Sequence, residues 1–169
     1  MKKLFKMFML TAVLVLGACA VDENNTDDND KEQTEPKKEY VLGGTLSAIM
    51  EGLYQTAEFD NSYMMTGEVT EERQNYYFGE ADIEYEEALA SEPMMGWGHS
   101  IVLVRVGEDV DVDAYKAELA ENVDRCKWIC VCVEEDEVVV ESIGDIIVII
   151  MDPLADEIKD AFLSMAEEK

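Results

Sequence analysis

The sequence predicts an α+β domain, a small antiparallel or mixed sheet with helices packed mainly on one face. Two observations predict this class, and a third indicates that the domain has a core of its own. Helix-like and strand-like segments mix along residues 40–169 without strict alternation. Two strand-forming runs meet at Gly144-Asp145, a dipeptide suited to a tight hairpin turn. Apolar residues make up 48% of the chain, enough for one core without disulfides or metals.

The first half of this domain predicts two helices separated by a weakly patterned region. Thr45 is expected to cap the first helix, because the apolar residues after it recur at helical spacing: Leu46, Ile49, Met50, Leu53 and Tyr54. Residues 59–78 lack a clean period and are expected to form mostly loop, with one short strand in "SYMMTGEV". Acidic residues followed by Pro93 predict a helix over about 82–91.

The second half predicts a strand, a helix, a hairpin and a terminal helix. Residues 100–106 are β-branched and apolar, as in a strand. Asp111 is expected to cap a helix whose buried stripe holds Val112, Tyr115, Leu119 and Val123. Residues 128–151 contain the two hairpin runs, and the apolar run 146–151 predicts a central strand covered on both faces. Asp152-Pro153 is expected to start the last helix, which buries Leu154, Ile158, Phe162 and Met165.

Residues 1–18 have the pattern of a signal peptide. Lys2, Lys3 and Lys6 precede an uncharged apolar run over residues 7–18. That run is about twelve residues long, whereas a helix needs roughly 20 to cross the hydrocarbon core. The acidic residues that follow it also differ from the lysines and arginines that flank a membrane span on its cytoplasmic side. A cleaved segment is therefore expected here.

Leu16-Gly17-Ala18-Cys19 resembles the lipobox of bacterial lipoprotein signal peptides. The resemblance implies cleavage before Cys19 and lipidation of its thiol, which places the protein on the extracytoplasmic face of the cell membrane. Two acyl chains anchor a protein stably where one chain is marginal. The alternative is a plain secretory signal whose cleavage site adjoins a cysteine. Residues 19–39 are acidic, contain Pro36 and have almost no large apolar residue, so they predict a disordered tether.

The charge of the chain limits its partners. The formal net charge is −26, and loss of the three lysines before Cys19 would take it to −29. Such a field repels phosphate backbones and anionic lipid headgroups, which disfavours nucleic-acid binding. Solubility is the ordinary explanation of this charge, and capture of a cationic or metal-ion partner is the alternative.

The cysteines after Cys19 allow three interpretations. Cys126, Cys130 and Cys132 have the spacing C-x3-C-x-C, and His99 is a candidate fourth metal ligand. This spacing differs from the common C-x2-C, and no second cysteine pair is present. A disulfide between Cys126 and either neighbour is the second interpretation. Free thiols are the favoured one, because free cysteine is among the most buried residue types.

No constellation of residues predicts catalysis or a cofactor. His99 adjoins Ser100, but neighbouring residues on a strand point to opposite faces, so His99 cannot activate Ser100 directly. A hydrolase near His99 is kept only as a third hypothesis. The acidic run at 109–113 begins like a calcium loop, but Ala114 and Ala120 stand where its glycine and glutamate belong. Met64-Met65 and residues 93–99 either line a groove together or fill the core.

Several strings resemble those of a family of small lipoproteins from clostridia and their relatives, made of a domain of unknown function. They are Pro93-Met94-Met95, His99-Ser100, Asn122-Val123-Asp124, Lys127-Trp128-Ile129-Cys130-Val131 and Ile143-Gly144-Asp145. The resemblance implies a lipidated extracytoplasmic domain without assigned catalytic residues. We therefore expect a non-enzymatic module that binds a peptide, protein or cell-envelope ligand at the surface of a Gram-positive-type cell. The alternative is a metal- or redox-dependent protein using Cys126, Cys130 and Cys132.

Overall fold

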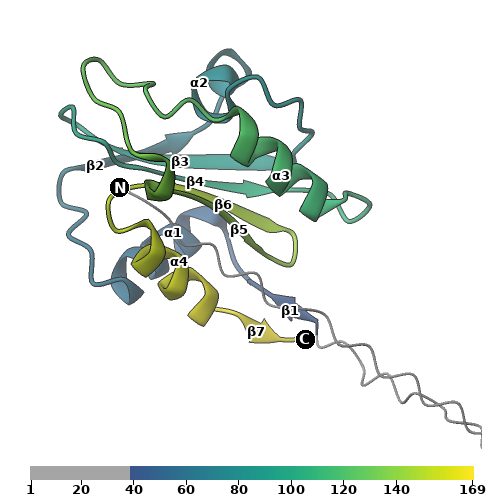
Figure 1. Ribbon diagram of the computed structural model, residues 1–169. Coiled ribbons are helices and arrows are strands. Elements are labelled where there is room, and N and C mark those ends of the chain that lie inside the picture. The colour runs from purple at the N-terminus through teal and green to yellow at the C-terminus, as the bar shows by residue number, and fades with distance from the viewer. Residues whose placement is uncertain (1–38) are drawn as a thin grey trace, which may run out of the picture. The chain divides into compact units, whose positions relative to one another are not determined.

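A five-stranded antiparallel sheet forms the centre of the domain in the computed structural model, which describes residues 39–169 (Figure 1). The predicted signal peptide, Cys19 and nearly all of the tether lie outside the described residues. The strand order is β2-β3-β4-β6-β5. The strands are β2 (Met64–Glu68), β3 (Glu87–Pro93), β4 (Ser100–Arg105), β5 (Val138–Ile143) and β6 (Ile146–Met151). The α+β class and the antiparallel sheet are confirmed.

The inner strands β4 and β6 are apolar on both sides and almost completely buried. Every residue of β6 is buried, as its unalternated apolar sequence predicts. The β5–β6 hairpin turns at Gly144-Asp145, also as predicted, with Gly144 at φ +57°. Glycine suits that position, because an L side chain is strained at positive φ.

Helices cover both faces of this sheet, which corrects the expectation that they pack mainly on one face. Figure 1 shows α1 (Leu46–Thr56) and α4 (Ala155–Ser164) on one side, and α2 (Gln74–Phe78) and α3 (Val112–Asn122) on the other. Each pair shares a separate hydrophobic cluster with the sheet. Because β4 and β6 expose apolar side chains on both faces, one helical layer would leave the other face in water.

Two of the predicted helix starts are confirmed and one is wrong. Thr45 Oγ1 accepts a hydrogen bond from the Ala48 N–H at 3.2 Å, and Asp111 Oδ1 accepts one from the Ala114 N–H at 3.1 Å. The last helix starts at Ala155, later than predicted. Asp152 Oδ1 does accept the Leu154 N–H at 2.7 Å, but this bond forms a turn before the helix.

The helix predicted over 82–91 is also wrong, because this region contains strand β3. Residues 88–91 are all buried, and their backbone pairs with β2 on one side and β4 on the other. Pairing on two sides outweighs the local helical preference of the alanines and glutamates. The predicted short strand in residues 59–78 is confirmed as β2, and the same region also contains the short helices η1 (Glu71–Arg73) and α2.

A second, two-stranded sheet joins the two ends of the domain. It pairs β1 (Tyr40–Val41) with β7 (Glu167–Glu168), and the sequence carried no signal for it. The short helix η2 (Glu135–Glu137) precedes β5. The Tyr40 carbonyl oxygen lies close to Gly144, so the described chain enters the domain beside the β5–β6 hairpin. None of the helices within residues 39–169 is both long and apolar enough to cross a membrane.

Candidate functional site

His99, the only histidine, lies in a buried polar network below the sheet. Its side chain is 0% exposed. His99 Nδ1 lies 2.7 Å from Asp152 Oδ2, and His99 Nε2 lies 3.2 Å from the Tyr54 hydroxyl. The ring also stacks on Phe59, with 4.7 Å between ring centroids. Both ring nitrogens therefore have protein partners, as buried polar atoms require.

The network continues from Tyr54 toward the edge of the sheet. The Tyr54 hydroxyl donates to Ser91 Oγ at 2.9 Å, and Thr66 Oγ1 donates to the same oxygen at 2.9 Å. Burial raises the pKa of Tyr54 to about 12, so the phenol keeps its proton at neutral pH. Because His99 and Ser91 are both 0% exposed, a substrate cannot reach them in this conformation. The arrangement joins α1, β3 and the segment before α4.

The side chain of Ser100 does not bond to the His99 ring, as expected for adjacent residues whose side chains point in opposite directions. Ser100 Oγ accepts a hydrogen bond from Lys127 Nζ at 2.9 Å, within a second polar cluster. Lys127 Nζ also lies 2.9 Å from Glu92 Oε1 and within 5.0 Å of the rings of Tyr76, Tyr77 and Trp128. Burial lowers the pKa of Lys127, while Glu92 opposes that shift. Lys127 thereby fastens its loop to β3 and β4.

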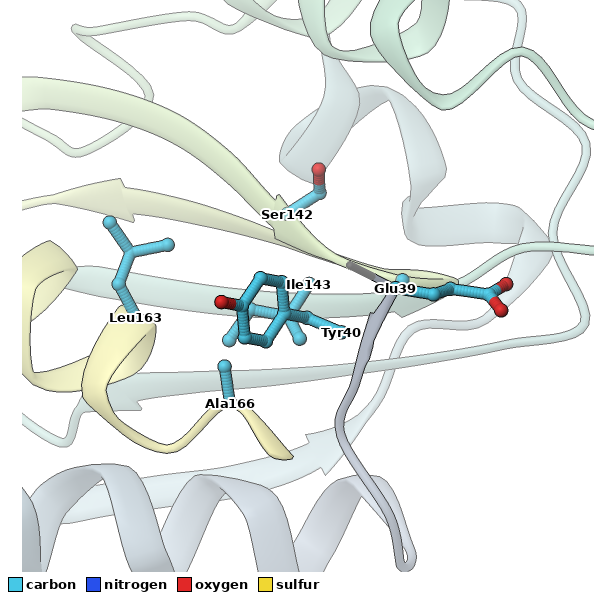
Figure 2. Close-up of a pocket in the computed structure, with 7 residues that line it drawn as sticks. Glu39, Tyr40, Ser142, Ile143, Leu163 and Ala166 are labelled. Carbon is cyan, nitrogen blue, oxygen red and sulfur yellow. The ribbon is translucent and has the colours of Figure 1, made fainter. Parts of the chain in front are cut away.

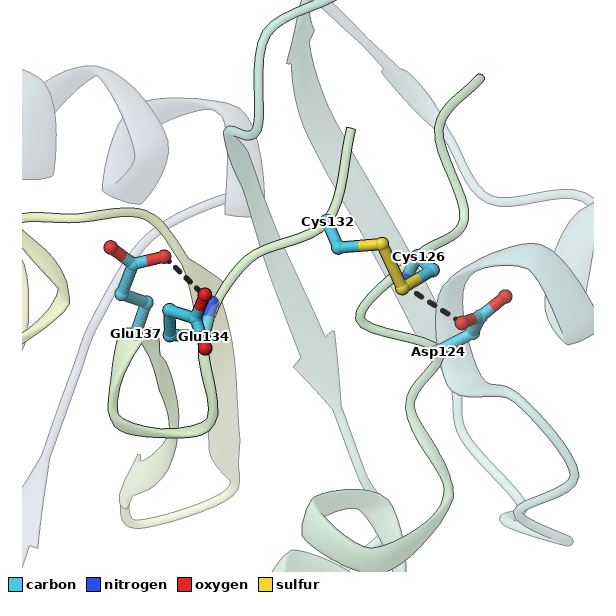
Figure 3. Close-up of a disulfide and its surroundings, with 5 residues drawn as sticks. All are labelled: Asp124, Cys126, Cys132, Glu134 and Glu137. Atoms are coloured by element: carbon cyan, nitrogen blue, oxygen red, sulfur yellow. Dashed lines mark hydrogen bonds between the residues drawn. A yellow bond between two sulfur atoms is a disulfide. The ribbon is translucent and has the colours of Figure 1, made fainter. Parts of the chain in front are cut away.

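That loop contains a disulfide between Cys126 and Cys132, with an S–S distance of 2.08 Å (Figure 3). The expectation of three free thiols is therefore wrong for this pair, and one of the two disulfides considered from the sequence is present. Trp128 bridges to Val131, which places Ile129 and Cys130 at the tip of a tight turn. Cys130 is free and exposed at φ +64°, and Ile129 is 92% exposed. We call residues 126–132 the disulfide turn.

The structure does not bring the four candidate metal ligands together. Cys126 and Cys132 bond to each other, and a disulfide sulfur is a poor substitute for the thiolate that zinc prefers. Both nitrogens of His99 are engaged by Asp152 and Tyr54. Within residues 39–169, no group of three or more His, Cys, Asp or Glu side chains is arranged to hold a metal ion.

Exposed apolar side chains gather at the end of the sheet where β2 and β4 begin and β3 ends. Five of the nine exposed large hydrophobic residues described occur there, and we call them the methionine surface: Tyr63, Met65, Met94, Met95 and Trp97. The Met94 N–H donates to the Tyr63 carbonyl oxygen at 2.9 Å, which joins the two segments. Met95 is 73% exposed and Met65 is 65% exposed. Met64 instead packs toward the α1–α4 core.

The disulfide turn adjoins this surface. A Cβ atom built on Gly98 would lie 2.9 Å from Val133 and 3.2 Å from Val131, so the loop after β3 packs directly on the disulfide loop. The Cys126 N–H donates to Asp124 Oδ1 at 2.9 Å, and the Glu134 N–H donates to Glu137 Oε2 at 2.8 Å (Figure 3). These bonds order the chain on either side of the disulfide.

A separate open groove of about 930 Å³ lies beside the β5–β6 hairpin. Figure 2 shows Tyr40, Ile143, Leu163 and Ala166 lining it, together with Glu39 and Ser142. This groove mixes polar and apolar side chains, and it lies where the described chain enters the domain. The methionine surface lies at the opposite end of the strands from this groove. Ser100 and Val138 pair with Met151 at the end with the methionine surface, and Ile143 pairs with Ile146 at the end with the groove.

Comparisons of the chain with protein-family models, with curated proteins and with solved structures found no match. The resemblance to clostridial lipoproteins therefore stays a prediction. Sequence reasoning did not find the partners of His99, because Tyr54 was counted only as a core residue and Asp152 only as a helix cap. The sequence left open whether the Met-Met dipeptides line a groove or fill the core, with core filling the commoner use; Met64 packs toward the core, whereas Met65, Met94 and Met95 are exposed.

We predict that His99→Ala will lower the free energy of unfolding by about 1–3 kcal/mol, because it leaves Oδ2 of the buried Asp152 without its hydrogen-bond partner. Urea unfolding followed by circular dichroism measures this change. The double variant His99→Ala/Asp152→Ala should lose less than the sum of the two single variants, since it removes both members of the pair. Strictly additive losses would contradict an energetic coupling between these side chains.

Proposed function

We propose that this protein is an extracytoplasmic lipoprotein, anchored through Cys19, whose domain binds a peptide, protein or cell-envelope ligand without catalysing a reaction. The methionine surface is the single observation that carries the binding role. Contiguous exposed apolar side chains on a folded domain commonly mark interaction sites. Methionine is frequent on surfaces that adapt to several partners, because its unbranched thioether side chain repacks at low cost.

The position of the methionine surface supports display away from a membrane. The described chain starts beside Gly144, whereas the surface lies at the other end of the strands. Six residues of strand span about 20 Å, so the two ends are well separated. A tether attached at Glu39 therefore joins the domain at the end opposite its apolar surface.

The charge of the domain supports binding to a partner in preference to lying on a lipid surface. Residues 39–169 contain 32 Asp and Glu against seven Lys and Arg. This excess of carboxylates repels anionic headgroups, so the lipid on Cys19 is the expected membrane contact.

A redox role for the disulfide turn is the second candidate. The exposed thiol of Cys130 lies two residues from Cys132, whose sulfur is bonded to Cys126. A Cys130 thiolate could exchange with an external disulfide, forming a mixed disulfide and releasing one thiolate from the external partner. The observation that favours this role is the exposure of Cys130, since only accessible thiols react.

We expect metabolic labelling with radioactive palmitate to mark the wild-type protein in its source cell and to leave Cys19→Ala unlabelled, because the Cys19 thiol carries the diacylglycerol. Cys130→Ala is the matched control and should keep its label. Mass spectrometry of the mature chain should find Cys19 as the first residue. A labelled Cys19→Ala protein, or an intact Met1, would contradict the anchor.

The binding role predicts that substitutions in the methionine surface reduce capture of cell-envelope components. The Cys19→Ala chain, immobilised, serves as bait for a detergent extract of the envelope. Adding Met65→Ser and Met95→Ser should lower the recovered material at least tenfold, because both side chains leave water on binding. Leu163→Ser, an exposed leucine at the opposite end of the sheet, is the control and should bind like the parent. Equal capture by both variants would rule out this surface.

Thiol counting distinguishes the redox candidate. Denatured without reductant, the Cys19→Ala chain should show one reactive thiol per chain, that of Cys130, because Cys126 and Cys132 are paired. Equilibration with a dithiol of known potential then measures the disulfide. Structural disulfides have potentials below about −300 mV, so a markedly less negative value would favour the redox role over the binding role.

A further inference from the structure

We propose that strand β2 is a receptor edge: an extended segment of a partner protein, with large apolar residues alternating with lysine or arginine, adds to β2 as a sixth strand. This inference rests on the proposed binding function and names the chemistry of its partner. Strand addition uses main-chain hydrogen bonds for affinity and the side chains beside the edge for specificity.

The hydrogen-bond pattern shows which backbone groups of β2 are free. The Met94 N–H donates to the Tyr63 oxygen, and the Val69 N–H donates to the Ala88 oxygen, each at 2.9 Å. In an antiparallel pair, hydrogen-bonded residues alternate with residues whose backbone groups point away from the partner strand. Tyr63, Met65, Gly67 and Val69 therefore face β3, and Met64, Thr66 and Glu68 face outward.

Two donors and three acceptors are available along this outward edge. The Met64 N–H already donates to the Asn61 oxygen at 2.9 Å. Within residues 39–169, the N–H groups of Thr66 and Glu68 have no acceptor. The carbonyl groups of Met64, Thr66 and Glu68 likewise have no donor there. Groups at i and i+2 match the repeat with which a neighbouring strand presents its own donors and acceptors.

The other edge of the sheet, strand β5, has fewer free N–H groups than β2. The Asp152 N–H donates to the Glu137 oxygen at 3.0 Å, so by the same alternation Val138, Val140 and Ser142 face outward on β5. The Val138 N–H donates to the Glu135 oxygen, and the Ser142 N–H donates to Glu141 Oε1 at 2.9 Å. Local acceptors thus occupy two of the three outward donors of β5 and one of the three on β2.

The side chains around β2 leave room for a partner and supply apolar contacts. Met65 and Tyr63 project from the same side of β2, next to Met94 and Met95. Gly67 has no side chain, and no atom lies within 4 Å of the place its Cβ would take. A large apolar side chain from an added strand can therefore lie over Gly67 and beside Met65.

The charge near this edge specifies a cationic partner. Residues 57–73, which contain β2, hold five carboxylates against one cation, Arg73, which lies 3.9 Å from Glu92. The five carboxylates are those of Glu58, Asp60, Glu68, Glu71 and Glu72. Natural proteins commonly protect an exposed edge with lysine, and β2 has none. Pairing of β2 with β2 of a second copy would bring ten carboxylates together, which disfavours self-association. Lysine or arginine on an incoming strand would instead offset this local charge.

The test uses the mature chain with Cys19→Ala, labelled with ¹⁵N, and the synthetic probe acetyl-(Val-Lys)4-amide. Amide hydrogen exchange followed by NMR should slow at least tenfold for Thr66 and Glu68 when the probe is bound, with no change at Val140. The matched probe acetyl-(Val-Glu)4-amide should give no protection. A third probe carries N-methyl groups at alternate residues of the lysine peptide, on the edge that would face β2. It should also give no protection, because it has no N–H groups to donate to the Met64 and Thr66 carbonyl oxygens.

Each other outcome overturns the inference. If the lysine probe does not bind, or binds without protecting Thr66 and Glu68, strand addition is wrong. If envelope capture still depends on Met65 and Met95 in that case, the binding function stands alone. Equal protection by the glutamate probe removes the charge requirement. Protection without any probe, together with a dimer in sedimentation, would make a second copy the occupant of the edge. Loss of both probe binding and envelope capture would remove the binding function as well.

Discussion

The structure depends on burying β4 and β6 on both faces. Their apolar residues alternate between the two hydrophobic clusters, for example Ile101 and Leu103 on one side and Val102 and Val104 on the other. Burial of apolar surface stabilises the folded state by about 25 cal/mol per Å². Both faces of these strands must therefore be covered. This requirement places α1 and α4 below the sheet and α2 and α3 above it. It also leaves β2 and β5 as the two edges.

Most polar side chains in this interior bond to one another, although the buried Trp128 Nε1 has no hydrogen-bond partner among the described residues. Below the sheet, Asp152, His99, Tyr54 and Ser91 form one connected set. Above it, Lys127 pairs with Glu92 among aromatic rings. Both sets lie near the ends of β3 and β4 that carry the methionine surface. They hold the flanking loops to the sheet, and a defined surface needs such support, since an exposed loop is otherwise free to move.

The disulfide adds a covalent constraint to the same end of the domain. It closes the turn that presents Ile129 and Cys130, while Lys127 inside that turn reaches the sheet. Closing a loop reduces the conformations open to the unfolded chain, which stabilises the native arrangement. Disulfides persist in oxidising compartments, which is where the proposed lipid anchor would place the domain. The free edge of β2, the methionine surface and the disulfide turn thus occupy one region supported from both faces of the sheet.

The sequence alone determined the features whose causes are local. Thr45 and Asp111 cap helices because each side chain reaches its own first turn, and the Gly144-Asp145 hairpin follows from the backbone freedom of glycine. The unbroken apolar run of β6 was likewise sufficient to predict complete burial. The tertiary structure decided the rest. Residues 87–93 became a strand because β2 and β4 bond to both of their sides. Asp152 turned toward His99, and Cys126 met Cys132, because folding brought together groups whose distance no spacing in the sequence reveals.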